Sequence, residues 1–151
     1  ARSPNSVIIS NGFASMGIAL PGAIGAKLLY PQRKVVALCG DGGFMMSMAE
    51  LETACRIGVD IVVLIWTDAT YGMIKWKQED RYGHAFGIDF HNPDFVKLAE
   101  SFGATGVKLR KGDDLAAVLQ QALGHGGPVV IDCPVDYSEN AKLTDRLDRS
   151  E

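Results

Sequence analysis

Short, continuous apolar runs alternate along this chain with longer stretches in which apolar residues recur at helical spacing. Such runs are typical of parallel strands that are buried on both faces. The alternation predicts an α/β fold, with a mostly parallel sheet and helices on both of its faces. Strands are predicted at residues 6–10, 34–39, 60–66, 106–109 and 129–133, and helices at 21–29, 47–57, 72–80, 93–102 and 113–123.

Capping residues support these helix boundaries. Pro21 suits the first helical position, where a missing N–H group costs nothing. Asn92-Pro93-Asp94 and Asp113-Asp114 are typical helix starts, because an aspartate there can accept hydrogen bonds from first-turn amides. Glycines follow three of the predicted helices and mark where each one ends; they are Gly58, Gly103 and Gly124.

Two aspartates follow neighbouring apolar runs. Gly40-Asp41-Gly42-Gly43 ends the first run and Thr67-Asp68-Ala69-Thr70 ends the second, which places the aspartates 27 positions apart. Open α/β sheets bind ligands at the carboxyl ends of their strands, so both carboxylates are expected at one edge. They could share one hard cation, while the glycines let backbone N–H groups approach an anion. This pattern favours a divalent metal that bridges the protein to a diphosphate.

Two other interpretations of the glycine-rich turn are weaker. Most Gly-Asp-Gly triplets are only turns, but this one follows a buried strand. A dinucleotide-binding loop with the pattern G-x-G-x-x-G would need glycine at position 45, where the chain has Met45.

Composition narrows the classes of function. A chain of 151 residues that is 47 % hydrophobic can bury the core of one domain. The net charge of −3 argues against nucleic acid or an anionic membrane as partner. No apolar run reaches the roughly 18 residues of a membrane span. Three cysteines in or beside apolar stretches predict reduced thiols in a cytoplasmic protein.

Two further segments follow strand ends and are candidates for contact with a ligand. The loop at residues 11–16 could offer backbone groups, with Met16 as an apolar support. The helix predicted after Asp68 begins close to the metal-binding turn, and its Trp76 and Gln78 are candidates for lining a substrate pocket.

These motifs, taken together, resemble a known family. Gly40-Asp41-Gly42 and Asp68, followed by Tyr71-Gly72-Met73, resemble the cofactor-binding signature of thiamine diphosphate enzymes. The blocks at residues 16–26, 50–54 and 134–140 are similar to those of acetolactate synthases. The resemblance implies a three-layer thiamine diphosphate-binding fold over residues 1–135, followed by a C-terminal tail at 136–151. The first residue is Ala1, and the chain is expected to be the C-terminal part of a longer, three-domain enzyme.

The resemblance also assigns cofactor contacts. Asp41 and Asp68 would hold Mg²⁺ through their side chains, and Thr70 through its backbone carbonyl. The side chain of Met16 would support the bent cofactor from below. The full set of residues implied to contact the cofactor is Ala14, Ser15, Met16, Gly40, Asp41, Gly42, Gly43, Asp68, Thr70, Tyr71, Gly72 and Met73.

No catalytic residue is expected in this chain. In the family that it resembles, a glutamate on the N-terminal domain of a neighbouring subunit activates the cofactor. The partners implied are therefore that pyrimidine-binding domain, within a homodimer or homotetramer, and small 2-oxo acid substrates. A middle domain binds flavin in some relatives, so FAD is allowed in the full-length enzyme.

The function expected from the resemblance is decarboxylation of pyruvate and transfer of its hydroxyethyl unit to a second 2-oxo acid, in branched-chain amino acid biosynthesis. The family that the chain resembles usually has asparagine at the position of Asp68, although catabolic acetolactate synthases also carry aspartate there. One alternative is another thiamine diphosphate-dependent decarboxylase, oxidase or carboligase. An alternative of another class is a non-catalytic module that has kept the fold.

Overall fold

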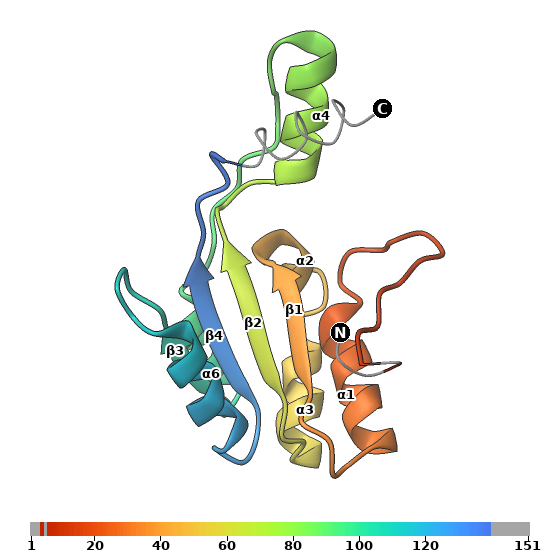
Figure 1. Ribbon diagram of the computed structural model, residues 1–151, viewed down its shortest axis with the longest axis vertical. Coiled ribbons are helices and arrows are strands. Elements are labelled where there is room, and N and C mark those ends of the chain that lie inside the picture. The colour runs from red at the N-terminus through yellow and green to blue at the C-terminus, as the bar shows by residue number, and fades with distance from the viewer. Residues whose placement is uncertain (1–3, 5, 140–151) are drawn as a thin grey trace.

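A four-stranded parallel sheet with helices on both faces forms the body of the protein (Figure 1). The computed structural model describes residue 4 and residues 6–139. The strands, in the spatial order β1-β2-β4-β3, are β1 (Val36–Gly40), β2 (Val62–Thr67), β3 (Thr105–Lys108) and β4 (Val129–Pro134). The helices are α1 (Ala19–Leu29), α2 (Asp41–Met45), α3 (Glu50–Ile57), α4 (Gly72–Tyr82), α5 (Phe95–Ser101) and α6 (Leu115–Leu123).

The two faces of the sheet bury alternate residues of each strand, as the strand period of two requires. Val63 and Ile65 of β2 pack in one cluster with residues of α1, α2, α3 and α5. Val62 and Leu64, the intervening residues, pack in a second cluster with residues of α6. Helix, sheet and helix therefore form three layers, which confirms the predicted fold class.

The edge strand β1 is only partly covered. Its Val36 and Leu38 pair with Val62 and Leu64, so they lie on the face of the sheet that α6 covers. Both remain exposed, at 40 % and 50 %. An apolar surface is thus left beside β1.

The strand predicted at residues 6–10 is wrong, since the structure has no strand there. Val7, Ile8 and Ile9 are 63 %, 84 % and 69 % exposed. Their apolar, β-branched side chains fit a strand pattern, but a strand is stable only when a neighbour supplies ladder hydrogen bonds and a buried face. Within the described residues, this segment takes part in none of the strand pairings.

The other predicted elements are present, with differences at their ends. The helix predicted at 47–57 is shorter, because turns occupy residues 46–49 and α3 begins at Glu50. The short helix α2 was not predicted; it begins at Asp41, where the sequence indicated only a turn. Asp94 and Asp114 cap α5 and α6 as expected, each accepting hydrogen bonds from two first-turn amides. The predicted domain boundary at residue 135 stays a prediction, and most of the tail, residues 140–151, lies outside the described residues.

Candidate functional site

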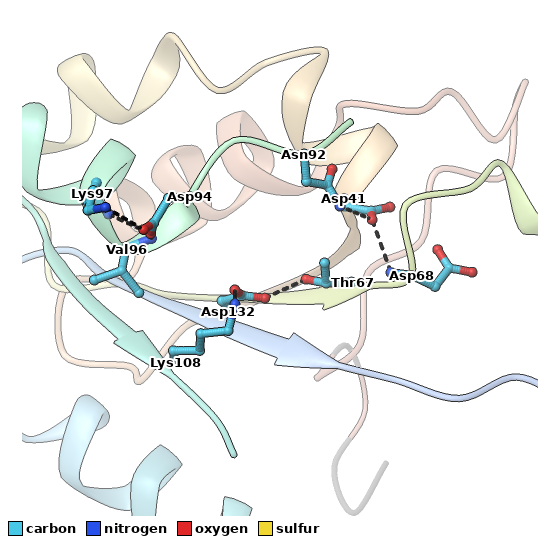
Figure 2. A network of polar contacts seen from close by, with 9 residues as sticks. All are labelled: Asp41, Thr67, Asp68, Asn92, Asp94, Val96, Lys97, Lys108 and Asp132. Atoms are coloured by element: carbon cyan, nitrogen blue, oxygen red, sulfur yellow. Dashed lines mark hydrogen bonds and ion pairs between the residues drawn. The ribbon is translucent and has the colours of Figure 1, made fainter. Parts of the chain in front are cut away.

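The carboxyl ends of β1 and β2 bring the two aspartate turns together. These strands are paired up to Gly40 and Trp66, so the residues that follow them leave the sheet side by side. The Oδ2 atom of Asp41 accepts hydrogen bonds from the amides of Asp68, at 3.1 Å, and Ala69, at 2.7 Å. Figure 2 shows the Asp68 backbone beside the Asp41 carboxylate.

Asp41 is a buried carboxylate that is surrounded by N–H donors. Its side chain is 2 % exposed. Besides the two amides of the second turn, Oδ2 accepts a hydrogen bond from Asn92 Nδ2 at 2.7 Å. Oδ1 has the amide of Gly42 as its donor, at 2.8 Å. Oδ2 is thus fully engaged by three donors, while Oδ1 keeps acceptor capacity for another ligand.

Asp68 is less constrained. It is half-buried, and its Oδ1 accepts one long hydrogen bond, 3.3 Å, from the amide of Thr70. Burial is the largest cause that raises the pKa of Asp68 above its usual value, and the negative charge of Asp41 raises it further, against the hydrogen bond from Thr70. A cation between the two carboxylates would oppose both causes, because it favours their charged forms.

A strand-like segment at residues 88–90 fixes the shape of the second turn. Ala69 adopts a left-handed backbone, with φ of 58°, and its carbonyl accepts from the amide of Phe90 at 3.1 Å. The carbonyl of Ile88 accepts from the amide of Tyr71 at 3.0 Å and from the hydroxyl of Thr70 at 3.3 Å. The amide of Tyr71 therefore has a protein partner in this structure.

The helix that follows, α4, presents its N-terminus to this site. Tyr71 is the N-cap residue, and no side chain caps the first-turn amides of this helix. A Cβ atom on Gly72, its first residue, would lie 3.6 Å from Asp68 Oδ2. The first residue of α4 thus adjoins a carboxylate, an arrangement that suits an anion held partly by the helix and partly through a cation.

Gly42 and Gly43 occupy the first turn of α2, on the other side of the site. A Cβ atom on Gly42 would lie 2.7 Å from Cε1 of the Tyr71 ring, which leaves no room for a side chain. A Cβ atom on Gly43 would meet only the backbone nitrogen of Gly17, at 3.8 Å. Gly42 therefore allows α2 and the start of α4 to approach each other closely.

The loop predicted to contact the cofactor lies on the surface. Ala14, Ser15 and Met16 are all exposed, Met16 by 46 %. Ala14 has a left-handed backbone, with φ of 47°. The loop reaches α2 through Gly17, where an added Cβ would lie 3.2 Å from Met46 Cβ. The structure thus places the loop beside α2, and no hydrogen bond between this loop and the two aspartates is found among the described residues.

The two candidates for a substrate pocket lie on α4, which extends beyond the carboxyl edge of the sheet and buries none of its residues (Figure 1). Trp76 is 38 % exposed, and the Lys77 ammonium lies 4.4 Å from the centre of its indole ring. Gln78 has a local role, since its Oε1 accepts from the amide of Phe86 at 2.8 Å. Gln78 thus holds the turn after α4, a role that its position in the sequence did not suggest.

Sequence reasoning missed two residues of the site. Asn92 donates to Asp41, although its Asn-Pro-Asp context indicated only a helix start. Tyr137 lies close enough to sense both aspartates: burial raises its pKa, and the charges of Asp68 and Asp41 raise it further. No local signal shows that either lies near Asp41, because that nearness depends on chain segments far apart in the sequence.

The donor set fits a hard divalent cation bound together with an anion. In residue 4 and residues 6–139, no three His, Cys, Asp or Glu side chains gather into a metal site. Two carboxylates alone leave most positions around Mg²⁺ to other oxygens, such as backbone carbonyls and phosphate oxygens. The uncapped N-terminus of α4 is suited to hold such a phosphate.

A comparison with family models decides the class of this domain. Residues 1–133 match the model of the thiamine pyrophosphate enzyme C-terminal TPP binding domain. The chain belongs to this family. Thiamine pyrophosphate is another name for thiamine diphosphate, so the predicted family and the predicted binding of this cofactor are confirmed.

Similar proteins include several acetolactate synthases. The chain is 50 % identical to the acetolactate synthase of Bacillus subtilis (strain 168) over 145 residues, which cover 95 % of this chain and 25 % of that protein. It is 44 % identical to a catabolic acetolactate synthase of Raoultella terrigena, over 96 % of this chain and 26 % of that protein. A pyruvate oxidase of Lactiplantibacillus plantarum is 39 % identical over 87 % of this chain and 22 % of its own length. The chain thus spans about a quarter of the length of these relatives.

Among the described residues, no helix is long and apolar enough to cross a membrane. Cys39, Cys55 and Cys133 are free thiols.

Proposed function

We propose that this domain binds the Mg²⁺–diphosphate end of thiamine diphosphate in an acetolactate synthase-like enzyme. That enzyme would decarboxylate pyruvate and join the hydroxyethyl unit to a second 2-oxo acid. The observation that carries the proposal is the meeting of Asp41, Asp68 and the uncapped N-terminus of α4 at one sheet edge. The 50 % identity to an acetolactate synthase supports the reaction.

Each part of the site has a role in this proposal. The side chains of Asp41 and Asp68 and the carbonyl of Thr70 would hold Mg²⁺. The amides of Gly42, Gly43, Gly72 and Met73 would face the diphosphate; Gly40 and Tyr71 would shape the two turns around it. Ala14, Ser15 and Met16 would meet the pyrimidine ring, once the loop is held against the rest of the enzyme.

The protein's contribution is binding and orientation. The cofactor, when bound, supplies the carbanion chemistry that decarboxylation needs. Asp41 is buried and accepts four hydrogen bonds, so it presents a fixed charge to the cation. The negative charges of Asp41 and Asp68 repel each other. A bound metal ion should reduce this repulsion and so favour binding of the diphosphate. Metal and cofactor should therefore bind cooperatively.

The substrate end of the site would be completed by another domain. Large apolar side chains of α4 and the turn after it are exposed, among them Met73, Trp76 and Phe86. A surface of this kind is typical of an interface. We infer that an N-terminal pyrimidine-binding domain of a neighbouring subunit covers it in a homodimer or homotetramer and supplies the activating glutamate. The isolated chain should then be unable to turn over pyruvate.

The test is calorimetric titration of thiamine diphosphate into the full-length protein, with and without Mg²⁺. Asp68→Ala should weaken Mg²⁺ binding strongly, whereas Asp68→Asn should weaken it less, because the amide oxygen can still coordinate. Asp68 is the better residue to change, since its side chain accepts only one long hydrogen bond within the described residues. Asp41→Ala would also leave four N–H donors of the site without their acceptor.

A matched control is Asp80→Asn, which removes the same charge from an exposed position on α4. This variant should bind Mg²⁺ and thiamine diphosphate with unchanged affinity. Equal cofactor affinity with and without Mg²⁺, or normal Mg²⁺ binding by Asp68→Ala, would refute the proposed site.

A second candidate reaction is oxidation of a 2-oxo acid, favoured by the 39 % identity to a pyruvate oxidase. Product analysis of the full-length protein with pyruvate separates the two, since the proposal expects acetolactate. Binding of cofactor without any turnover would instead indicate a non-catalytic module. Flavin, where the full-length protein contains it, would be held by another domain; the visible absorbance of the purified protein tests this.

Two further inferences concern the cell. Free thiols at all three cysteines favour a reducing compartment, and we infer a cytoplasmic location. Rescue of a strain that lacks acetolactate synthase, scored as growth without branched-chain amino acids, tests the predicted biosynthetic role. Failure to rescue, with acetolactate formation intact in vitro, would favour a catabolic role such as that of the Raoultella terrigena relative.

A further inference from the structure

Asn92 reaches Asp41 across a long separation in sequence. The two residues are 51 positions apart, and Asn92 Nδ2 lies 2.7 Å from Asp41 Oδ2. A carboxylate only accepts hydrogen bonds, so the nitrogen of the amide, and not its oxygen, must face Asp41. Figure 2 shows the Asn92 amide beside the Asp41 carboxylate.

The backbone around Asn92 is held on both sides. Before it, Phe90 donates its amide to the carbonyl of Ala69 in the second aspartate turn. After it, Pro93 restricts Asn92 to an extended backbone, and Asp94 caps α5. The side chain of Asn92 is therefore delivered to Asp41 by a segment with few alternative conformations.

An aromatic contact fixes the same pair of segments. Phe44 lies three residues after Asp41 on α2, and Phe95 lies three residues after Asn92 on α5. Their rings pack edge to face, with centroids 5.5 Å apart and planes at 82°, and both side chains are 1 % exposed. The distance between Asp41 and Asn92 is thus set by the core as well as by their hydrogen bond.

The other end of the Asn92 amide lacks a partner. Its Oδ1 is buried, and no hydrogen bond to it is found among the described residues. Burying an unpaired carbonyl is unfavourable, and an apolar side chain of the same size would avoid that cost. The local packing alone gives no reason for an amide here, whereas the Nδ2 donor to Asp41 does.

We propose that Asn92 is a positioning residue that orients the carboxylate of Asp41 for the cation. With Asn92 and two backbone amides on Oδ2, the carboxylate is held in one orientation, and Oδ1 would be left to hold the metal. This inference rests on the proposed function, because it assumes that Asp41 binds Mg²⁺. It adds a residue outside the two aspartate turns whose effect on the metal is exerted wholly through Asp41.

The test compares Asn92→Leu and Asn92→Ala with the unaltered full-length protein. Leucine has the same number of side-chain heavy atoms as asparagine, branched at the same position, and removes both the donor and the unpaired carbonyl; alanine removes the same donor with less crowding. Mg²⁺ affinity is measured by calorimetry, and the Mg²⁺ activation constant and kcat by kinetics. Partners of metal ligands typically contribute about 10- to 100-fold to metal affinity. Both variants should weaken Mg²⁺ binding by roughly this factor and raise the activation constant, with kcat at saturating Mg²⁺ nearly unchanged.

The control is His91→Leu, a substitution at the exposed neighbouring position of the same segment. It should leave the Mg²⁺ affinity unchanged. Normal affinity in either Asn92 variant would overturn the inference, as would a loss of kcat that saturating Mg²⁺ does not restore. If the unaltered protein binds the cofactor equally well without Mg²⁺, the proposed function has failed, which is a separate result.

Discussion

Replacement of Gly42 by alanine tests whether the two halves of the site are as close as the structure places them. A Cβ atom at this position would lie 2.7 Å from Cε1 and 3.1 Å from Cδ1 of the Tyr71 ring, and 3.4 Å from Phe90 Cζ. The Tyr71 ring packs on Phe90, with centroids 4.8 Å apart. The ring cannot move away freely, so either Tyr71 or the start of α2 must shift.

The size of the effect follows from overpacking. An extra methyl group in a tight contact typically costs about 1–3 kcal/mol, which raises a local opening equilibrium roughly 5- to 150-fold. Because Tyr71 is the N-cap of α4, its displacement should also move the amides of Gly72 and Met73. Gly42→Ala should therefore weaken cofactor binding as well as stability.

Hydrogen exchange of the full-length protein without cofactor measures the loss of local stability, at the amides of α2 and the first turns of α4. The matched control is Gly43→Ala, the next residue of the same helix, where an added Cβ meets only a backbone nitrogen at 3.8 Å. Alanine there should leave exchange unchanged or slow it, since alanine favours a helix over glycine by about 1 kcal/mol. Equal exchange in the two variants would refute the close approach of α2 and Tyr71.

Three further predictions concern the surroundings of the site. Thr67→Val removes the 2.6 Å hydrogen bond to the buried carboxylate of Asp132. Denaturant titrations should show a free energy of unfolding that is lower by about 1.5–3 kcal/mol. Thr67→Ser, which keeps the hydroxyl, should have most of the original stability. The pKa of Asp94 is lowered in the folded state, chiefly by the hydrogen bond that it accepts from the backbone amide of Lys97. The stability that this carboxylate contributes is therefore present above its unfolded pKa and is lost as pH falls through the lower, folded pKa. The melting temperatures of the unaltered protein and Asp94→Asn should converge over that acidic range; a constant difference would count against it. Trp76→Ala should change the product ratio among competing 2-oxo acids while cofactor affinity stays nearly intact, and an unchanged ratio would remove Trp76 from the substrate pocket.

Local sequence signals predicted the sheet and the meeting of the two aspartate turns at its carboxyl edge. The apolar runs that became β2 and β4 bury both faces, so a simple continuous pattern was enough to find them. Asp94 and Asp114 were found at helix starts because capping depends on residues within one turn. The strand predicted at 6–10 failed for the opposite reason, since strand formation depends on a partner that local pattern does not specify.

The missed features of the site all depend on long-range contacts. Asp41 was recognised as a candidate ligand, but nothing local to it shows which donors fix its carboxylate. The three donors to its Oδ2 come from residues 27, 28 and 51 positions further along the chain. Two of them are backbone amides, whose direction is set by the left-handed turn at Ala69 and not by residue type.

The third donor, Asn92, illustrates why one sequence motif can hide two roles. In Asn92-Pro93-Asp94, the aspartate caps α5 and fully accounts for a helix start, so the asparagine two residues earlier seemed to be part of the same signal. In the structure the two side chains point to different neighbours, Asp94 to the amides of Val96 and Lys97 and Asn92 to Asp41 (Figure 2). A residue that acts on a ligand through another side chain need not lie at a recognisable spacing from the other site residues in the sequence. Its position is fixed instead by packing such as that of Phe44 on Phe95. Residues of this kind must be found from the hydrogen-bond partners of the candidate ligands, and for Asp41 the described part of the chain supplies one side chain of this kind, Asn92.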